Sequence, residues 1–289
     1  MRYSIAFAAA ALASSVSAHG VITQVQGANG VNMPGLSVID GTPRDSGNPL
    51  SGSEADTSII RTKEMGGKAS ALGRTQGGGA VDAASAIATF MGSGGAAAGG
   101  AAATKRGLLD ALTGGAGGAK GAAGGAAAGT KTPKGTAEAG VAAAAGSGAS
   151  QGLPTTADDG TITMTFHQVN QDGAGPLTAA IDATSGGTDP AAFKKATVTQ
   201  DVPGIGIGGL SAASVMDFPV KVQMPQGMTC QGTAGGAQNV CIVRMQNAAL
   251  AGPFGGSAAF TQSTAAKKRA VEYNLRKRHM ARGILGKPE

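Results

Sequence analysis

Aromatic, charged and sulfur-containing residues are all scarce in this sequence. Its 289 residues include no tryptophan, two tyrosines, two cysteines and three histidines. Tyr3 and Tyr273 lie near the two ends, so the chain between them lacks the Trp and Tyr side chains that usually stack on flat carbohydrate surfaces. No apolar run of 18 residues follows the first 20 positions, so we expect no membrane span there.

Glycine, by contrast, is abundant, with 50 residues, while charged residues make up 14%. This composition indicates a chain that is partly of low complexity. From about residue 91 to 150 most residues are Gly or Ala, which offer too little side-chain area to offset the entropy of ordering the backbone. We therefore expect a mobile insertion there with a short helix over 104–112. A silk-like repeat is the alternative, although no fixed period is present.

The first 18 residues are typical of a secretory signal peptide. Arg2 supplies a positive start, an apolar run over 5–16 is too short to span a bilayer, and small or neutral residues precede Ala18. Cleavage after Ala18 would make His19 the first residue of a secreted, extracellular protein.

The formal charge of +6 comes from a basic tail over residues 267–289, which has eight Lys or Arg and two Glu. Residues 19–266 contain 14 basic and 15 acidic residues, so we expect no nucleic-acid partner. The pattern over 265–285 predicts a basic helix. A solvated tail, attachment to an acidic surface and proteolysis at its two dibasic pairs, 268–269 and 277–278, remain open.

Residues 19–266 are predicted to form one all-β domain, and we expect a monomer. Short alternating segments separated by Gly and Pro indicate an antiparallel β-sandwich of immunoglobulin-like or fibronectin-III-like type. The candidate strands are 21–25, 160–167, 177–182, 196–201, 218–224 and 239–246, and 54–61 is ambiguous between strand and helical turn. Apolar spacing near 3.6 residues predicts one helix over 80–91. Cys230 and Cys241 are expected to form a disulfide, because the protein is predicted to be secreted.

Two histidines are candidates for metal chemistry. His19 at a new N-terminus would offer its amine and a ring nitrogen, and His167, at the end of a predicted strand, would supply a third nitrogen. Three nitrogens in one plane suit Cu(II), so we expect one copper ion. The alternative for His167 is a surface histidine or a core histidine with satisfied hydrogen bonds. His279 lies in the basic tail.

Two resemblances bear on function. The start His19-Gly20-Val21 before a β-sandwich resembles the lytic polysaccharide monooxygenases, in which a histidine brace holds one copper. Longer strings resemble the Egh-type appressorial secreted virulence proteins of fungi, which implies secretion and a role at a host surface or cell wall. These strings are HGVITQVQGANGVNMPG, VIDGTPRD, GSEADTSIIR, HQVNQDGAGP, ATSGGTDPAAF, TVTQDVPGIG, DFPVKVQMP, AGPFGGSAAFTQS and YNLRKRHMARG.

The monooxygenase resemblance implies roles for further residues. Phe260 is the best match to the axial position of the copper, with Phe254 second. Gln262 matches the polar group that orients an oxygen species, and Gln171 is a weaker candidate. The implied partner is cell-wall polysaccharide, either chitin or β-glucan, or else a host surface.

The sequence departs from the Egh-type pattern at Ser46 and Ser51, where a cysteine pair is expected. The resulting hypothesis is a copper-dependent, monooxygenase-like virulence protein. The alternatives are a non-catalytic protein that binds copper or a glycan, and a surface protein acting through its insertion and tail. Glycoside hydrolysis by Glu54 with Asp56, or by the acidic pair 158–159, is disfavoured because closeness in sequence does not place two carboxyl groups across a bond.

Overall fold

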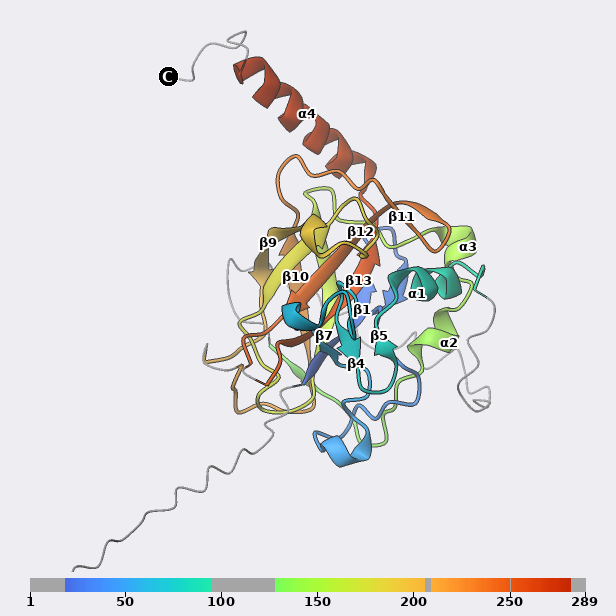
Figure 1. Cartoon of the computed structure of the whole chain (residues 1–289), viewed down its shortest axis with the longest axis vertical. Helices are drawn as coiled ribbons and strands as arrows, with labels where there is room; N and C mark the ends of the chain where they lie inside the picture. The colour runs from blue at the N-terminus through green and yellow to red at the C-terminus, as the bar shows by residue number, and fades with distance from the viewer. Residues whose placement is uncertain (1–18, 95–127, 206–208, 250, 282–289) are drawn as a thin grey trace, which may run out of the picture.

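The structure is a computed structural model, which describes residues 19–94, 128–205, 209–249 and 251–281 (Figure 1). The predicted signal peptide, the helix predicted over 104–112 and the end of the basic tail lie outside these ranges.

Antiparallel β-structure dominates the described residues. The strands are β1 (Gly20–Gln26), β2 (Asn32–Pro34), β3 (Ser58–Ile59), β4 (Arg74–Thr75), β5 (Gly79–Ala80), β6 (Thr130–Lys131), β7 (Thr161–Gln168), β8 (Thr178–Asp182), β9 (Phe193–Gln200), β10 (Met216–Gln223), β11 (Gly232–Ala234), β12 (Ala237–Gln246) and β13 (Phe254–Phe260). They pair in the order β2-β1-β7-β10-β9-β8-β12-β13-β3-β4-β5, with β6 beside β10 and β11 beside β12. The predicted all-β class is confirmed.

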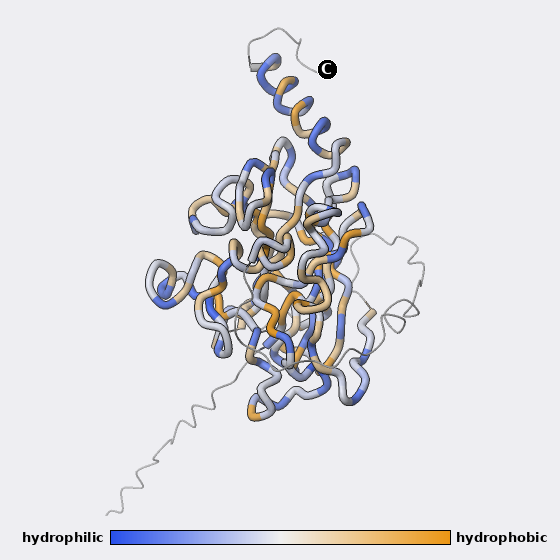
Figure 2. Tube along the Cα trace, turned by 90° about the vertical axis from the view of Figure 1, so that its right-hand side faces the viewer, coloured by the Kyte–Doolittle hydropathy of each residue, from blue (hydrophilic) through white to orange (hydrophobic). Residues whose placement is uncertain are grey.

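The strands form two layers because the sheet folds back on itself at β9, which pairs with both β10 and β8. Strand β1 consequently packs against β13: a Cβ built on Gly256 would lie 2.7 Å from the backbone nitrogen of Ile22. The core between the layers includes Met164 and Phe166, which alternate along β7 with residues of the opposite face. Figure 2 shows hydrophobic stretches gathered inside the body. The arrangement is sandwich-like, and the immunoglobulin-like or fibronectin-III-like subtype stays a prediction.

Helices are few and mostly short in the described ranges. They are the α-helices α1 (Ala83–Phe90), α2 (Gly140–Ala144), α3 (Gly148–Gln151) and α4 (Thr264–Ala281), and the 3₁₀ helices Pro49–Ser51, Thr62–Glu64 and Pro190–Ala192. Helix α1 confirms the helix predicted over 80–91. Asp82 starts it because its carboxylate accepts hydrogen bonds from the backbone N–H groups of Ala84 and Ser85.

The low-complexity insertion is shorter than the range 91–150 predicted from sequence. Residues 130–151 contain β6, α2 and α3, and β6 pairs with β10. Particular side chains tie down this segment: the carboxylate of Asp40 accepts hydrogen bonds of 2.9 and 2.7 Å from the N–H groups of Val141 and Ala142. A few polar contacts thus order a backbone whose Gly and Ala residues have little side-chain area to bury, which amino-acid composition alone does not reveal.

The Cys230–Cys241 disulfide is confirmed, and both cysteines are buried. It joins the connection before β11 to β12, next to the hairpin that these strands form. A disulfide in this position fits a protein made in an oxidising compartment.

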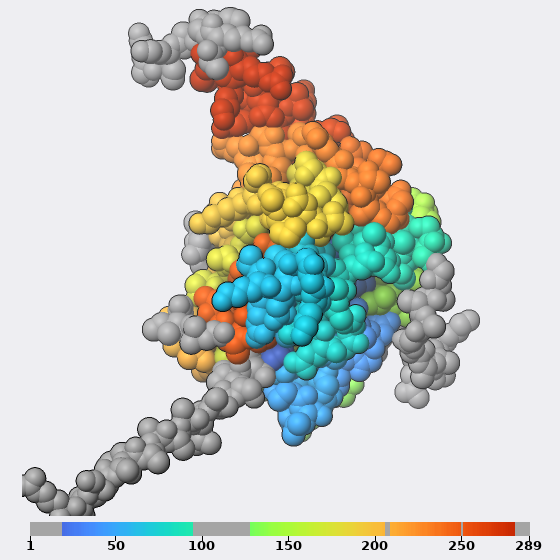
Figure 3. Space-filling view, in the orientation of Figure 1, coloured from blue at the N-terminus to red at the C-terminus, as the bar shows by residue number. Residues whose placement is uncertain are grey.

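Helix α4 protrudes from the body (Figures 1 and 3). Ala266 and Ala270 are buried at its base, and Asn274 donates a hydrogen bond of 2.8 Å to the carbonyl of Gly227. Both dibasic pairs of the tail lie inside this helix. Within the part of the chain that the structure describes, no helix combines the length and apolarity needed to cross a membrane.

Asp182 is a buried carboxylate that organises the turn after β8. It accepts hydrogen bonds from the backbone N–H groups of Thr184, Ser185 and Gly187 and from the hydroxyl of Ser185. Burial acts to raise the pKa of Asp182, but these hydrogen bonds outweigh it, so the pKa is lowered. Because the pKa is lower in the folded protein, Asp182 stabilises the fold at pH values above the pKa of Asp in the unfolded chain, which is about 3.9. This stabilisation is lost as the pH falls through the pKa of the folded state.

We therefore expect Asp182→Asn to destabilise the protein by about 1–3 kcal/mol at neutral pH. The variant should also lose less stability than the wild type when the pH is lowered to about 3. Urea unfolding at both pH values measures this difference. Asp158→Asn is the matched control, because Asp158 is exposed. An Asp182→Asn variant with the wild-type pH dependence would contradict the assignment.

Candidate metal site around His19 and His167

His19 lies directly before β1, and only 1% of its surface is exposed. Its backbone nitrogen donates a hydrogen bond of 2.9 Å to Oδ1 of Asn170, and its Nδ1 is 2.9 Å from Oε1 of Glu54. The imidazole also packs at a tilt against the ring of Phe254, with 4.5 Å between centroids. Asn170 Nδ2 donates a hydrogen bond of 3.0 Å to Glu54, so these two side chains hold each other around the histidine.

His167 lies on β7 and is completely buried. Asp217 stands opposite it on β10, and the distance from His167 Nδ1 to Asp217 Oδ1 is 2.7 Å. An ionised carboxylate can only accept a hydrogen bond, so the proton of a neutral His167 ring sits on Nδ1 and Nε2 presents a lone pair. A carboxylate in this position is the usual outer partner of a metal-binding histidine.

The strand register places both histidines on one face of the sheet. Gly20 pairs with Gln168 and Val21 with His167, and the N–H of Val169 donates to the carbonyl of His19. His19 and His167 are thus diagonal neighbours on adjacent strands, a relation that places residues about 7–8 Å apart. This face is opposite to the one that carries the main core. The structure therefore brings together the two histidines that the sequence singled out.

Three ring nitrogens at this site are buried without a hydrogen-bond partner: both nitrogens of His19 and Nε2 of His167. The 2.9 Å approach of Glu54 to His19 Nδ1 is an ion-pair distance without hydrogen-bond alignment. Leaving a buried polar atom unpaired costs about 1–3 kcal/mol, so a ligand that engages these nitrogens would remove that cost. Among the described residues, no cluster of three or more His, Cys, Asp or Glu has metal-binding geometry.

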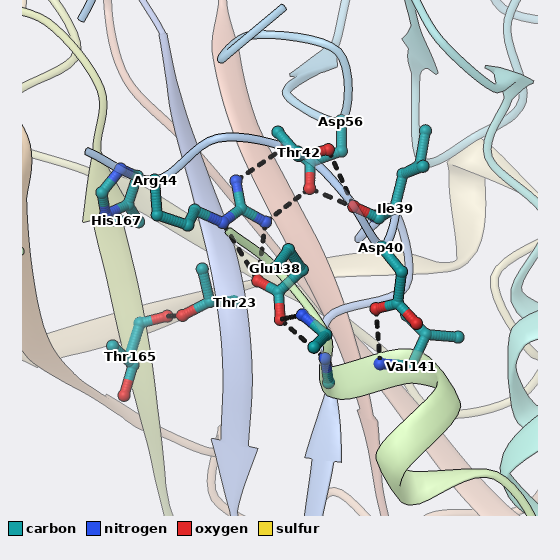
Figure 4. Close-up of polar contacts among 12 residues, drawn as sticks. Thr23, Ile39, Asp40, Thr42, Arg44, Asp56, Glu138, Val141, Thr165 and His167 are labelled. Atoms are coloured by element: carbon teal, nitrogen blue, oxygen red, sulfur yellow. Dashed lines mark hydrogen bonds and ion pairs between the residues drawn. The ribbon is translucent and has the colours of Figure 1, made fainter. Parts of the chain in front are cut away.

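A buried ion-pair cluster lies beside His167 (Figure 4). The guanidinium of Arg44 donates hydrogen bonds of 3.0 and 2.5 Å to Asp56 and of 3.0 and 2.8 Å to Glu138. Burial acts to lower the pKa of Arg44, but attraction and hydrogen bonds from the two carboxylates outweigh it, and the pKa is raised. The cluster fixes the 42–57 segment against the 130–139 segment.

Phe260 and Gln262, the two residues singled out from the monooxygenase resemblance, lie toward the end of β13 that is distant from His19. Phe260 ends β13, pairs with Cys241 and is part of the main core. Gln262 accepts a hydrogen bond from the backbone of Cys230 and donates one to the carbonyl of Met228. Phe254 begins the same strand and contacts His19. Phe254 and Phe260 are six residues apart, so the rise per residue of a strand separates them by about 20 Å. A strand pattern does not show which end of the strand meets the histidine.

The remaining sequence candidates are placed as follows. Gln171 is exposed near the site. Glu54 contacts His19 while Asp56 pairs with Arg44, so these two acidic residues have separate partners. Ser51 Oγ donates a hydrogen bond of 3.1 Å to Ser46 Oγ, so the two positions where a cysteine pair was expected are in contact.

Sequence reasoning missed the residues that support the histidines: Asn170, Asp217 and the Arg44 cluster. Asp217 could be found only from the pairing of β7 with β10, because it is 50 positions from His167. Glu54 carried one signal, which was an acidic residue in a segment otherwise rich in turn-forming residues.

Comparisons with known proteins agree with the family resemblance. The family model described as Egh16-like virulence factor matches residues 17–255. An appressoria-specific virulence factor, GAS2, from Pyricularia oryzae is 60% identical over 98% of this chain and 97% of its own length. The appressoria-specific virulence factor GAS1 of the same fungus is 39% identical over 43% of this chain and 50% of its own. No solved structure matches. The chain therefore belongs to the Egh16-like virulence factor family.

Proposed function

We propose that this chain is a secreted, virulence-associated fungal protein that binds one copper ion between His19 and His167 and does not cleave polysaccharide. The observation that carries the proposal is the set of three buried imidazole nitrogens that lack hydrogen-bond partners on one sheet face. The appressoria-specific relatives support the virulence role, and the disulfide is consistent with secretion.

The nitrogen donors fit copper better than other first-row metals. Removal of residues 1–18 would free the amine of His19, which together with His19 Nδ1 and His167 Nε2 makes three nitrogen ligands. Cu(II) prefers such a tetragonal, nitrogen-rich set. Asp217 holds the proton on His167 Nδ1 and keeps the Nε2 lone pair available. Phe254 contributes packing against the His19 ring and no ligand atom.

Burial favours binding over turnover on a polymer. His19 and His167 are 1% and 0% exposed in the chain that still carries residues 1–18, and we propose that the site stays closed to a solid polysaccharide in the processed chain. Among the large apolar side chains that the structure leaves exposed, Tyr273 is the one aromatic residue, and it lies on α4. The surface of the described residues thus lacks a flat aromatic platform next to the site.

Two measurements test this proposal. The processed protein should bind one Cu(II), and a chain with one extra residue before His19 should bind it at least about tenfold more weakly, because its first nitrogen ligand is lost. Mass spectrometry of chitin and β-glucan incubated with copper-loaded protein and a reductant should find no oxidised oligosaccharides. Equal copper affinity of the two chains would contradict the site, and oxidised products would contradict the non-catalytic assignment.

A further inference from the structure

A cavity of about 470 Å³, lined by both polar and apolar residues, opens on the same sheet face as His167. Its size lies within the range of small-molecule sites. It is formed by β1, β2, β7 and β10 on one side and by the 132–147 segment on the other. The polar and charged residues of its lining include Thr23, Arg44, Thr132, Glu138, Thr165 and Asp217.

The charges in this cavity are unbalanced toward the negative. Arg44 is its one lining cation, and the guanidinium is already engaged by Asp56 and Glu138. Asp217 adds a further carboxylate with no cation beside it among the described lining residues. Lys131 and Lys134 are exposed nearby and do not line the cavity. An anionic ligand is therefore disfavoured, and a cationic one is attracted.

Two polar side chains of the lining have unused hydrogen-bonding capacity. Asp217 uses Oδ1 on His167, and its side chain is 40% exposed, so Oδ2 can accept a hydrogen bond from outside. Thr132 is buried, with 7% of its surface exposed, and its Oγ1 has no hydrogen-bond partner. A buried hydroxyl without a partner costs free energy unless a ligand or water pairs with it.

The described lining of the cavity includes no aromatic residue, so it offers a ligand no ring to stack on. Thr23 and Thr165 also line the cavity, and the hydroxyl of Thr23 donates a hydrogen bond of 3.4 Å to the carbonyl of Thr165 (Figure 4). Hydroxyls of a sugar match such a lining, and a primary ammonium matches the carboxylate of Asp217.

We propose that this cavity binds a hydroxyl-rich primary amine, the chemistry of a glucosamine unit. The ammonium binds Oδ2 of Asp217, and a ring hydroxyl pairs with Oγ1 of Thr132. Neither His19 nor His167 lines the cavity, and the two sites share Asp217, which contacts His167 through Oδ1 and would bind the ammonium through Oδ2.

Calorimetric titration of the full-length processed protein with three tetramers tests the proposal. The probes are β-1,4-linked glucosamine, its N-acetylated form and β-1,3-linked glucose. The glucosamine tetramer should bind at least about tenfold more tightly than the other two, because only it offers an ammonium to the carboxylate. Equal binding of the three tetramers, or no binding of glucosamine, would overturn the proposal.

Three variants locate the site. Asp217→Asn should weaken glucosamine binding at least about tenfold, and Thr132→Val about fivefold. Thr132→Val is nearly isosteric and removes a hydroxyl that has no partner, so the fold should persist. Asp158→Asn removes the same charge at an exposed position and should change nothing. Unchanged affinity in Asp217→Asn would also overturn the proposal.

Copper stoichiometry on the same samples separates this site from the copper site. Thr132→Val should bind one copper with wild-type affinity while its affinity for glucosamine falls. A protein that binds glucosamine but no copper would refute the metal site alone.

Discussion

Replacement of His167 by alanine is expected to lower Cu(II) affinity by at least about 100-fold. Loss of a residue that only supports a metal ligand typically lowers metal affinity about 10–100-fold. The His167→Ala variant removes the proposed ligand itself. The ring is buried, so its removal also leaves a cavity, and circular dichroism must show that the variant is folded. A competition titration against a copper chelator of known affinity gives the change.

His279→Ala is the matched control for this experiment. His279 is exposed on α4, away from the sheet face that carries the candidate site, so its removal should leave copper affinity unchanged. If His167→Ala were folded and bound copper like the wild type, His167 would not be a ligand. An equal loss in the His279 variant would instead point to nonspecific binding by surface histidines.

Replacement of Arg44 by methionine is expected to destabilise the fold by about 3–5 kcal/mol. The reason is that Asp56 is fully buried and Glu138 nearly so, and both would lose the cation that compensates their charge. Urea unfolding at neutral pH measures the change in the free energy of unfolding. Lys68→Met is the control, because Lys68 is exposed and should change stability by less than about 0.5 kcal/mol.

A triple variant separates the penalty of unpaired charge from the worth of the cluster. When Arg44, Asp56 and Glu138 are all replaced by apolar residues of similar volume, most of the lost stability should return, because no buried charge remains. A single Arg44→Met variant as stable as the wild type would contradict the assignment of this cluster as the clamp between the 42–57 and 130–139 segments.

The strands of the sheet were predictable from the sequence because their alternation reflects two different environments. Along 161–167 every second residue enters the core, and the observed β7 covers Thr161–Gln168. The ambiguous 54–61 segment forms turns and the two-residue strand β3, since its main role is to carry Glu54 and Asp56 to their partners. Such a role leaves no periodic signal.

Of the candidate site, only the two histidines could be predicted from the sequence. His19 and His167 could be singled out because histidine is rare in the chain and one copy follows the predicted cleavage position. Their supporting residues depend on strand pairing across large sequence separations, which no local pattern records. Asp217 reaches His167 from 50 positions away, and Asn170 reaches His19 from 151. For the same reason, no local pattern shows that Phe254 lies closer to His19 than Phe260 does.

Electron paramagnetic resonance of the processed protein, loaded with one equivalent of Cu(II), tests the copper site most directly. The account predicts a single axial spectrum of a tetragonal site with hyperfine coupling to nitrogen, and its loss in His167→Ala. A spectrum identical to that of copper in buffer, or one unchanged in His167→Ala, would contradict a metal site between His19 and His167.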